Sequence, residues 1–300
     1  MYFQAIKLIL PALFKNKKLT FIVVVGTITL IGLSVAFNKW RQWFYDSVQA
    51  YNSHAIYLGL AAFTVLALIY VVVYGLASFY TRHLEFASRQ YLYDKFSALI
   101  FKAHDAGIPN VEQRIQDDSL RFSKTSIALL KAILDSVVRL PVFLLLLAAV
   151  AKPWMLVVVL IYAIIGTIMS RKVANKLISA EYYQEGLEAT LRRDLLDTLK
   201  NKSTVPTLKD IMANWSELAL RQKYLSYYTS FYGQISVIFP FIMLMPMFLS
   251  KTIMLGTLFA TSSAIEQVLG SLSVFVDSRD LVVDLNMTTK RLKEVEGVKK

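Results

Sequence analysis

The chain has 300 residues, of which 56% are hydrophobic and only 18% are charged. Soluble domains are usually about 45–50% apolar and about 25% charged, so this composition excludes a soluble globular enzyme and a disordered chain. The sequence contains no cysteine, which excludes disulfides, thiolate nucleophiles, cysteine-based zinc sites and iron–sulfur clusters. We therefore expect an all-α membrane protein that crosses the bilayer several times.

Six apolar runs are candidates for membrane spans, because a hydrocarbon core of about 30 Å requires about 20 helical residues. The third run is interrupted by Lys131, Asp135 and Arg139, and the fifth contains Pro240 and Pro246. The predicted spans are residues 19–37, 57–79, 126–151, 154–169, 232–249 and 253–276.

The positions of the basic residues predict the orientation. Of the 33 Lys and Arg residues, 27 lie before the first span, in 80–125, in 170–231 or after 276, whereas 4 lie in the alternating loops. Because cytoplasmic loops collect Lys and Arg, both termini and the two large loops are predicted to be cytoplasmic. This bias also accounts for the net charge of +12 without a nucleic-acid partner.

Residues 1–18 precede the first span, and their apolar part is too short to cross a membrane. This segment lacks a charged n-region and a small-residue cleavage site, so it is not a signal peptide. Its apolar residues, with Lys7 as the one charge among the first fourteen, predict a helix that lies in the membrane interface and ends before Pro11.

Both large loops are expected to be helical. After the second span, apolar residues recur at three- and four-residue spacing until Gly107 and Pro109, where we expect a break. A new helix is expected from Asn110 into the third span, and the fourth span is expected to continue to about residue 199. After a break at 201–206, a further helix is expected from Leu208. Residues 80–125 and 170–231 are thus predicted to be cytoplasmic helical hairpins.

Together these features predict a single transmembrane domain, residues 1–300, with the layout of the exporter-type (type 1) transmembrane domain of ABC transporters. None of the eleven glycines forms a G-x-x-x-x-G-K-[ST] loop, so no nucleotide site is predicted. His54, His83 and His104 are scattered, with no carboxylates at ligand spacing. We expect no metal, no cofactor, no catalytic group and no enzymatic activity.

The run from Val111 to Ser123 reads V-E-Q-R-I-Q-D-D-S-L-R-F-S. It resembles the E-Q-R-x-x-E/D-D-x-x-R-F-S segment of the SbmA/BacA peptide-antibiotic transporters. The run N-K-W-R-Q-W-F-Y-D at 38–46 resembles the N-x-W…F-Y-D element of that family, and Glu181 and Glu188 match its paired glutamates. The runs that begin at Pro206 and Thr288 also resemble family segments. The motif residues are Trp40, Phe44, Tyr45, Asp46, Gln113, Arg114, Asp117 and Asp118.

This resemblance covers roughly residues 20–295. It implies a homodimer in the bacterial inner membrane, surrounded by lipid, that takes up a peptide substrate. It further implies that the proton gradient drives uptake without ATP or another nucleotide. Longer members of the family carry an additional N-terminal membrane region, which is missing here or reduced to residues 1–14.

Proton coupling requires a carboxylate that titrates near ambient pH, and burial or a neighbouring negative charge raises a carboxylate pKa. Glu181, Glu185 and Glu188 are spaced so that they share one helix face, and we predict that they form a proton-coupling ladder that attracts cationic peptides. The alternative is a solvated helix face close to Arg192 and Arg193.

Charged residues within predicted spans are a second group of candidates. Asp135 shares a helix face with Lys131 and Arg139, and a charge at mid-bilayer costs roughly 2.5–3.5 kcal/mol. This face should therefore point away from lipid, either for function or as an ion pair that joins helices. Glu266 in the sixth span is a candidate proton carrier in a cavity.

Two further patterns have structural interpretations. The segment from Gln113 to Asp118 is predicted to cap the long helix and order the hairpin, and Arg114 and Asp118, four residues apart, are able to pair. Four tyrosines are predicted to form an aromatic belt at the membrane interface rather than a substrate platform. They are Tyr224, Tyr227, Tyr228 and Tyr232.

Three functions remain open from the sequence. The first is a proton-driven peptide importer. The second is the permease subunit of an ABC transporter whose ATPase is a separate chain. The third is a shortened, non-transporting paralogue that modulates a full-length relative.

Overall fold

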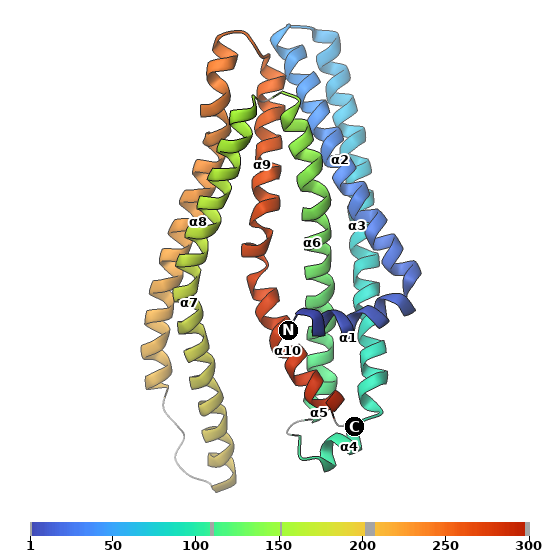
Figure 1. Ribbon diagram of the computed structural model, residues 1–300, viewed down its shortest axis with the longest axis vertical. Helices are drawn as coiled ribbons and strands as arrows, with labels where there is room; N and C mark the ends of the chain where they lie inside the picture. The colour runs from blue at the N-terminus through green and yellow to red at the C-terminus, as the bar shows by residue number, and fades with distance from the viewer. Residues whose placement is uncertain (1, 109–110, 151, 202–207, 298–300) are drawn as a thin grey trace. The chain divides into compact units, whose positions relative to one another are not determined.

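The computed structural model describes residues 2–108, 111–150, 152–201 and 208–297 (Figure 1). Asn110 and most of the predicted break at 201–206 lie outside the described residues, as do the side chains of Glu181 and Glu185. In the described ranges all regular structure is helical. The elements are α1 (Tyr2–Lys15), α2 (Lys17–Gln49), α3 (Ser53–Ser97), α4 (Ile100–Asp105), α5 (Val111–Gln113), the π-helical turn η1 (Arg114–Asp118), α6 (Ser119–Ala148), α7 (Pro153–Asn201), α8 (Lys209–Leu249), α9 (Leu255–Asp277) and α10 (Arg279–Gly297).

The chain divides into two compact units. The first comprises Met1–Pro153 together with Leu244–Lys300, and it holds α1 to α6, α9 and α10. The second comprises Trp154–Met243, which is the hairpin of α7 and most of α8.

Four helices among the described residues are long and apolar enough to cross a membrane. They are α2, α3, the Pro153–Ser170 part of α7 and the Ile211–Leu249 part of α8. These helices contain the spans predicted at 19–37, 57–79, 154–169 and 232–249, so the chain is a multi-pass helical membrane protein. The runs predicted as the third and sixth spans are observed as α6 and α9. The total of six spans stays a prediction.

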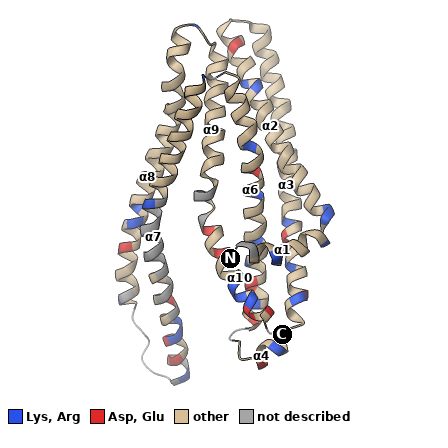
Figure 2. Ribbon diagram, in the orientation of Figure 1, with Lys and Arg blue, Asp and Glu red and all other residues tan. Residues whose placement is uncertain are grey.

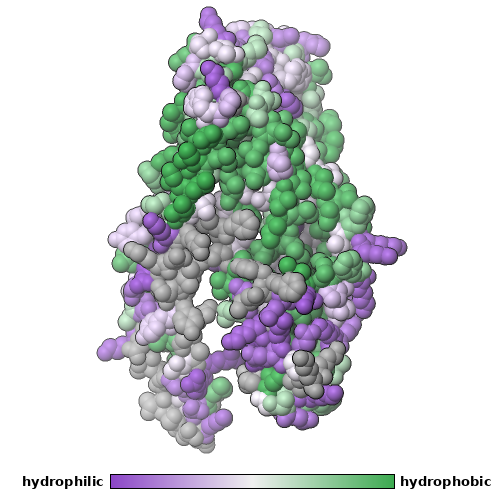
Figure 3. All heavy atoms as spheres, viewed as in Figure 1, coloured by the Kyte–Doolittle hydropathy of each residue, from purple (hydrophilic) through white to green (hydrophobic). Residues whose placement is uncertain are grey.

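Apolar side chains cover the outside of these helices. Only 6% of the most apolar window of α3 is buried, and Leu68 and Val71 are more than 60% exposed. In Figure 3, apolar surface extends along α2 and α3, whereas hydrophilic surface gathers around α10. Exposed apolar surface on this scale is typical of a protein that contacts lipid.

The helical continuation of both hairpins is confirmed for the described residues, while their cytoplasmic location stays a prediction. Helix α3 extends to Ser97 and α7 extends to Asn201. The first hairpin differs in detail, because α3 ends well before Gly107 and the short helix α4 follows it. Leu99, between the two helices, is buried, so packing bends the chain where no sequence breaker stands. Gly107, with φ of 73°, follows the end of α4.

The prediction that the N-terminal helix ends before Pro11 is wrong. Helix α1 continues through Pro11 to Lys15. Leu8, Ile9 and Ala12, on both sides of the proline, are at most 3% exposed and belong to one core cluster. Burial of this face offsets the hydrogen bond that a proline removes from a helix interior.

The core cluster of the first unit joins segments that are distant in the sequence. Leu8 of α1 packs with Phe96 of α3, Phe122 of α6 and Leu292 of α10, and all four are at most 1% exposed. This core holds helix α10 against residues 111–123, the hairpin motif, which includes η1.

The second unit is joined by aromatic rings between α7 and α8. Tyr162 stacks on Tyr232 at 5.2 Å and on Phe239 at 4.2 Å, measured between ring centroids. The hydroxyl of Tyr228 donates a hydrogen bond of 2.9 Å to the carbonyl of Gly166. A Cβ atom at Gly166 would collide with the Tyr232 ring, so the close approach requires glycine. Tyr228 and Tyr232 therefore join the two helices.

Tyr224 and Tyr227 differ from these two tyrosines. Their side chains are 57% and 64% exposed. The predicted aromatic belt stays a prediction for this pair.

Candidate functional site

An ion pair lies on α6 in the first unit. Arg139 donates from Nε and Nη2 to the two carboxylate oxygens of Asp135, at 2.8 Å each. A bidentate arginine–carboxylate pair of this kind combines charge with fixed geometry. The side chains are 18% and 32% exposed, respectively.

The same guanidinium connects α6 to two further helices. Its Nη1 donates to Oε1 of Gln267 on α9 at 2.7 Å and to the hydroxyl of Ser34 on α2 at 3.3 Å. Nearby, the hydroxyl of Ser136 donates to the carbonyl of Ser271 on α9 at 2.7 Å. Arg139 thus connects α6 to α9 and α2, which is the arrangement that the ion-pair interpretation of this face requires.

Glu266 lies directly beside Gln267 in the sequence but on another face of α9. The residues from Thr261 to Ile265 are buried, whereas Glu266 is exposed in the single chain. Its carboxylate therefore points away from the packed seam of α6 and α9. It is available to water, to lipid or to another protein surface.

The start of α9 is capped by side chains of α2. The N–H of Gly256 donates to Oδ1 of Asp46 at 2.8 Å, and the N–H of Leu255 donates to Oε1 of Gln49 at 2.6 Å. The first N–H groups of a helix have no partner within the helix, and a negative charge there is favourable. A Cβ at Gly256 would collide with the carbonyl oxygen of Gln42, so glycine permits this contact.

The aromatic residues of the motif at 38–46, which also contains Asp46, join α2 to α3 and α9. Nε1 of Trp40 donates to the carbonyl of Gly59 on α3 at 2.8 Å, and the indole stacks on Phe44 at 5.0 Å. Tyr45 stacks on Phe259 of α9 at 4.4 Å. Trp40, Phe44, Tyr45 and Asp46 therefore fix the packing of α2, α3 and α9.

The hairpin motif docks on α10. Arg114 forms an ion pair with Glu294 and also donates to the carbonyl of Arg291 at 3.2 Å. Arg121 donates to both carboxylate oxygens of Asp284, at 2.9 and 3.3 Å. Figure 2 shows acidic and basic residues together around α10.

Asp118 is the buried member of this contact. Its side chain is 6% exposed, and Oδ1 lies 3.5 Å from Nη1 of Arg291. Oδ2 is buried with no hydrogen-bond partner among the described residues. Burial raises the pKa of the Asp118 carboxyl above its ordinary value, and the positive charges of Arg291, Arg114 and Arg121 partly counteract this.

Arg114 and Asp118 each have an ion-pair partner on α10, and the positive charge of Arg114 also acts on the Asp118 carboxyl. The reason is that α10 packs along this segment and places Glu294 and Arg291 opposite the motif. Gln113 is half-buried and Asp117 is exposed, so neither is as enclosed as Asp118.

Of the predicted glutamate ladder, only the Glu188 side chain is described. It is exposed and accepts a hydrogen bond of 3.1 Å from Nε2 of Gln184. Gln184 is 7% exposed, and its Oε1 accepts from Asn214 of α8 at 2.8 Å. Glu188 is thus hydrogen-bonded to Gln184, a residue that connects α7 to α8. Glu188 belongs to the second unit, whereas Asp135 and Glu266 belong to the first.

Sequence reasoning missed the partners that α10 supplies. Asp284, Arg291, Glu294 and Glu296 all pair with residues before position 122; Glu296, for example, accepts from Lys95 at 2.6 Å. The available signal was the mixture of acidic and basic residues in the tail, opposite the basic residues of the hairpin.

Comparison with known proteins shows which family the chain belongs to and which proteins it resembles. Residues 15–299 match the SbmA/BacA-like family. The inner membrane ABC transporter ATP-binding protein YddA of Escherichia coli (strain K12) is 22% identical, over 93% of this chain and 57% of its own length. ABC transporter D family member 2, chloroplastic, of Arabidopsis thaliana is 24% identical, over 91% of this chain and 41% of its own length. The chain thus spans about half the length of these relatives.

The chain is helical throughout its described residues, has several helices long and apolar enough to cross a membrane, and is similar to ABC transporters. It belongs to the SbmA/BacA-like family, as its hairpin motif indicates.

Proposed function

We propose that the chain is a proton-driven secondary transporter that imports peptides across the bacterial inner membrane as a homodimer, with both termini in the cytoplasm. Family membership supports transport. The peptide substrate and the proton gradient follow from the resemblance of the motifs. The presence of acidic residues on α7 and α9 supports the proposal, because proton coupling requires a carboxylate that titrates.

The observation that carries the proposal is the position of Glu266. It is exposed on a helix whose preceding residues are buried, and it directly precedes Gln267, which accepts the hydrogen bond from Arg139. A carboxylate within a predicted span is stable only where it meets water or another protein surface. A second copy that encloses a water-filled cavity with this one would provide both.

In this proposal Glu266 binds and releases the proton, while Arg139 holds α6 and α9 in place. Glu188 lies on the hairpin of α7 and α8, exposed beside Gln184. Together with Glu181 and Glu185 it would take part in proton coupling and attract cationic peptides by charge. A membrane potential supplies about 2.3 kcal/mol for each charge and each 100 mV, so one or two protons suffice for modest accumulation.

The test is uptake of a labelled cationic peptide into proteoliposomes that contain the purified full chain, with an imposed proton gradient and no ATP. We expect uptake that collapses when a protonophore is added. Glu266→Gln should abolish the gradient-dependent part, and native mass spectrometry should show two copies. Uptake that is equal with and without the gradient would overturn the proposal.

A second candidate is the permease subunit of an ABC transporter with a separate ATPase chain. The similarity of the chain to ABC transporters, one of which is named an ATP-binding protein, favours it. Vanadate-sensitive, ATP-dependent transport with a co-purified ATPase would support this candidate.

The shortened, modulating paralogue is the third candidate. It would reduce uptake when co-expressed with a full-length relative and show none by itself. Autonomous uptake in a strain that lacks the relative would eliminate it.

A further inference from the structure

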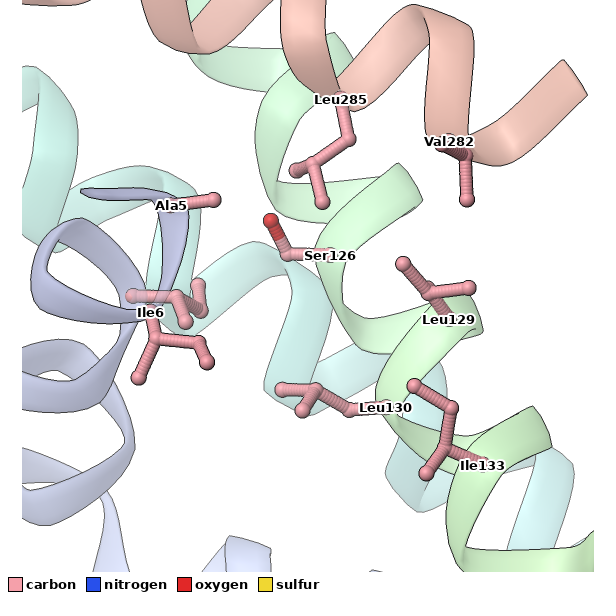
Figure 4. Close-up of a pocket in the computed structure, with 9 residues that line it drawn as sticks. Ala5, Ile6, Ser126, Leu129, Leu130, Ile133, Val282 and Leu285 are labelled. Atoms are coloured by element: carbon pink, nitrogen blue, oxygen red, sulfur yellow. The ribbon is translucent and has the colours of Figure 1, made fainter. Parts of the chain in front are cut away.

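A cavity of about 380 Å³ lies between α1, α6 and α10, all within the first unit (Figure 4). Such a volume is in the range of small-molecule sites, which run from about 300 to 1,000 Å³. Its wall is apolar apart from one hydroxyl group. The lining residues are Ala5, Ile6, Ile9, Ser126, Leu129, Leu130, Ile133, Val282 and Leu285.

The single hydroxyl in this wall has no partner. Ser126 is 3% exposed, and its Oγ has no hydrogen-bond partner among the described residues. In Figure 4 this oxygen points into the space between Ala5 and Leu285. A serine or threonine in a helix commonly donates its hydroxyl hydrogen bond to the carbonyl four residues earlier. Thr27 and Ser271 do so in this structure. The cost of an unpaired buried hydroxyl indicates that a ligand group completes this site.

The surroundings of the cavity indicate which ligand fits. The outer side of α1 is itself apolar, with Ile6, Leu10 and Phe14 between 43% and 71% exposed. When both the buried face and the exposed face of a helix are apolar, the exposed face is suited to contact with lipid. The cavity wall is therefore continuous, through Ile6, with surface that faces the membrane.

The N-terminal part of this region, α1 and the first residues of α2, carries only positive charges. Lys7, Lys15, Lys17 and Lys18 lie in or directly after α1, and the first acidic residue of the chain is Asp46. All four lysines are exposed. Basic residues at a membrane surface attract anionic headgroups, with about 1 kcal/mol for each Lys or Arg.

We propose that this cavity holds one acyl chain of an anionic membrane phospholipid. The hydrocarbon chain fills the apolar space, the hydroxyl of Ser126 donates a hydrogen bond to the ester carbonyl, and the headgroup lies among the lysines of α1. The bound lipid would hold α1 against α6 and α10. This site is independent of the proposed peptide transport.

The experiment uses the full chain in phosphatidylcholine vesicles that contain a minor fraction of phosphatidylglycerol with a photoactivatable diazirine in one acyl chain. After irradiation, peptide mass spectrometry locates the adducts. We expect adducts on α1, α6 and α10 at lining residues. They should be displaced by unlabelled phosphatidylglycerol and much less by phosphatidylcholine.

Variants test the cavity itself. Ile6→Trp and Leu130→Trp place a large ring at its partly exposed edge and should abolish cavity labelling. Leu10→Trp and Leu145→Trp are matched controls on the same helices, exposed but outside the cavity, and should leave labelling unchanged. Ser126→Ala should weaken binding about three- to tenfold, because it removes one hydrogen bond.

Three outcomes would overturn the proposal. Labelling confined to the outer surface of α2 and α3 would show ordinary lipid contact only. Equal displacement by phosphatidylcholine would show that the site does not select an anionic headgroup. Labelling that survives both cavity-filling variants would place the acyl chain elsewhere. Peptide uptake is measured separately, so that failure of transport and failure of lipid binding are distinguished.

Discussion

Arg139 on α6 donates a hydrogen bond of 2.7 Å to Gln267 on α9, while its other nitrogens hold Asp135. One guanidinium thus satisfies a carboxylate within its own helix and an amide on a helix far away in the sequence. This arrangement explains how a predicted span accommodates two opposite charges.

We expect Arg139→Met to destabilise the protein by about 2 kcal/mol. Breaking a buried ion pair costs about 3–5 kcal/mol, and the partial exposure of both side chains reduces this figure. The measurement is thermal unfolding in detergent, followed by tryptophan fluorescence. Arg221→Met, at an i, i+4 pair with Glu217 in which the side chains are 33% and 54% exposed, is the control and should change stability by less than about 0.5 kcal/mol.

The double variant Asp135→Leu with Arg139→Met should recover part of the lost stability, because it removes the uncompensated carboxylate as well. A double variant as unstable as Arg139→Met alone would contradict the assigned role of the pair.

Two glycines of α9 should respond oppositely to a methyl group. Gly256→Ala should prevent folding or greatly reduce the yield of folded protein, because the added Cβ collides with the backbone carbonyl of Gln42. Gly270→Ala meets nothing within 4 Å and should be neutral or stabilise by up to about 1 kcal/mol, as helix propensity favours alanine. Size-exclusion chromatography and thermal unfolding measure both. Equal behaviour of the two variants would contradict the close contact of α2 with α9.

The pairing of Asp46 with the start of α9 makes a separate prediction. Asp46→Ala should cost about 1 kcal/mol, since it leaves the N–H of Gly256 without its acceptor. Asp46→Asn keeps an acceptor oxygen and should restore most of the loss. If Asn and Ala were equally destabilising in thermal unfolding, charge and not capping would be the dominant contribution.

Asp118 predicts a dependence of stability on pH. Its pKa is raised in the folded state, so the folded protein binds a proton more readily than the unfolded chain does. The contribution of this group is fully present below its ordinary pKa of 3.8 and is lost as the pH rises through its higher folded-state pKa. Relative to Asp118→Asn, the wild type should therefore lose stability as the pH rises over this interval.

The measurement for Asp118 is chemical unfolding in detergent at several pH values, with the exposed neighbour variant Asp117→Asn as the control. A difference between wild type and Asp118→Asn that grows in favour of the wild type with rising pH would show that Arg291 outweighs burial.

Glu188→Gln should abolish proton-dependent peptide uptake while the protein stays folded. In this variant Nε2 of Gln184 still has an acceptor, because the amide oxygen of the new glutamine replaces the carboxylate oxygen of Glu188. Glu112→Gln, at an exposed position of α5, is the matched control and should transport as the wild type does. Undiminished uptake by Glu188→Gln would argue strongly against the glutamate ladder.

The helices and the candidate motifs could be predicted from the sequence to a large extent. Apolar runs and their spacing depend on nearby residues, and this is why α7 and α8 were predicted close to their observed bounds. Helix α2 continues to Gln49, well beyond the predicted end of the first span at residue 37. The continuation of α1 through Pro11 could not be predicted, because it depends on core partners such as Phe96 and Leu292. The early end of α3 has the same cause, since Leu99 is buried there.

The partners of the charged residues were the least predictable part of the site. Arg114 has an acidic neighbour four residues away, which favours a local pair on sequence grounds. The observed partner, Glu294, is 180 residues away and comes close only because α10 packs along the motif.

Composition and the distribution of charge were sufficient to establish a multi-pass helical membrane chain, and short motifs were sufficient to indicate its family. Hydropathy and motif identity are local properties that do not depend on how the helices meet. Only the folded chain decided that the Asp46 carboxylate caps α9, that Arg139 joins three helices and that the hydroxyl of Ser126 faces an apolar cavity. Each of these depends on atoms brought together by packing between segments that are distant in the sequence.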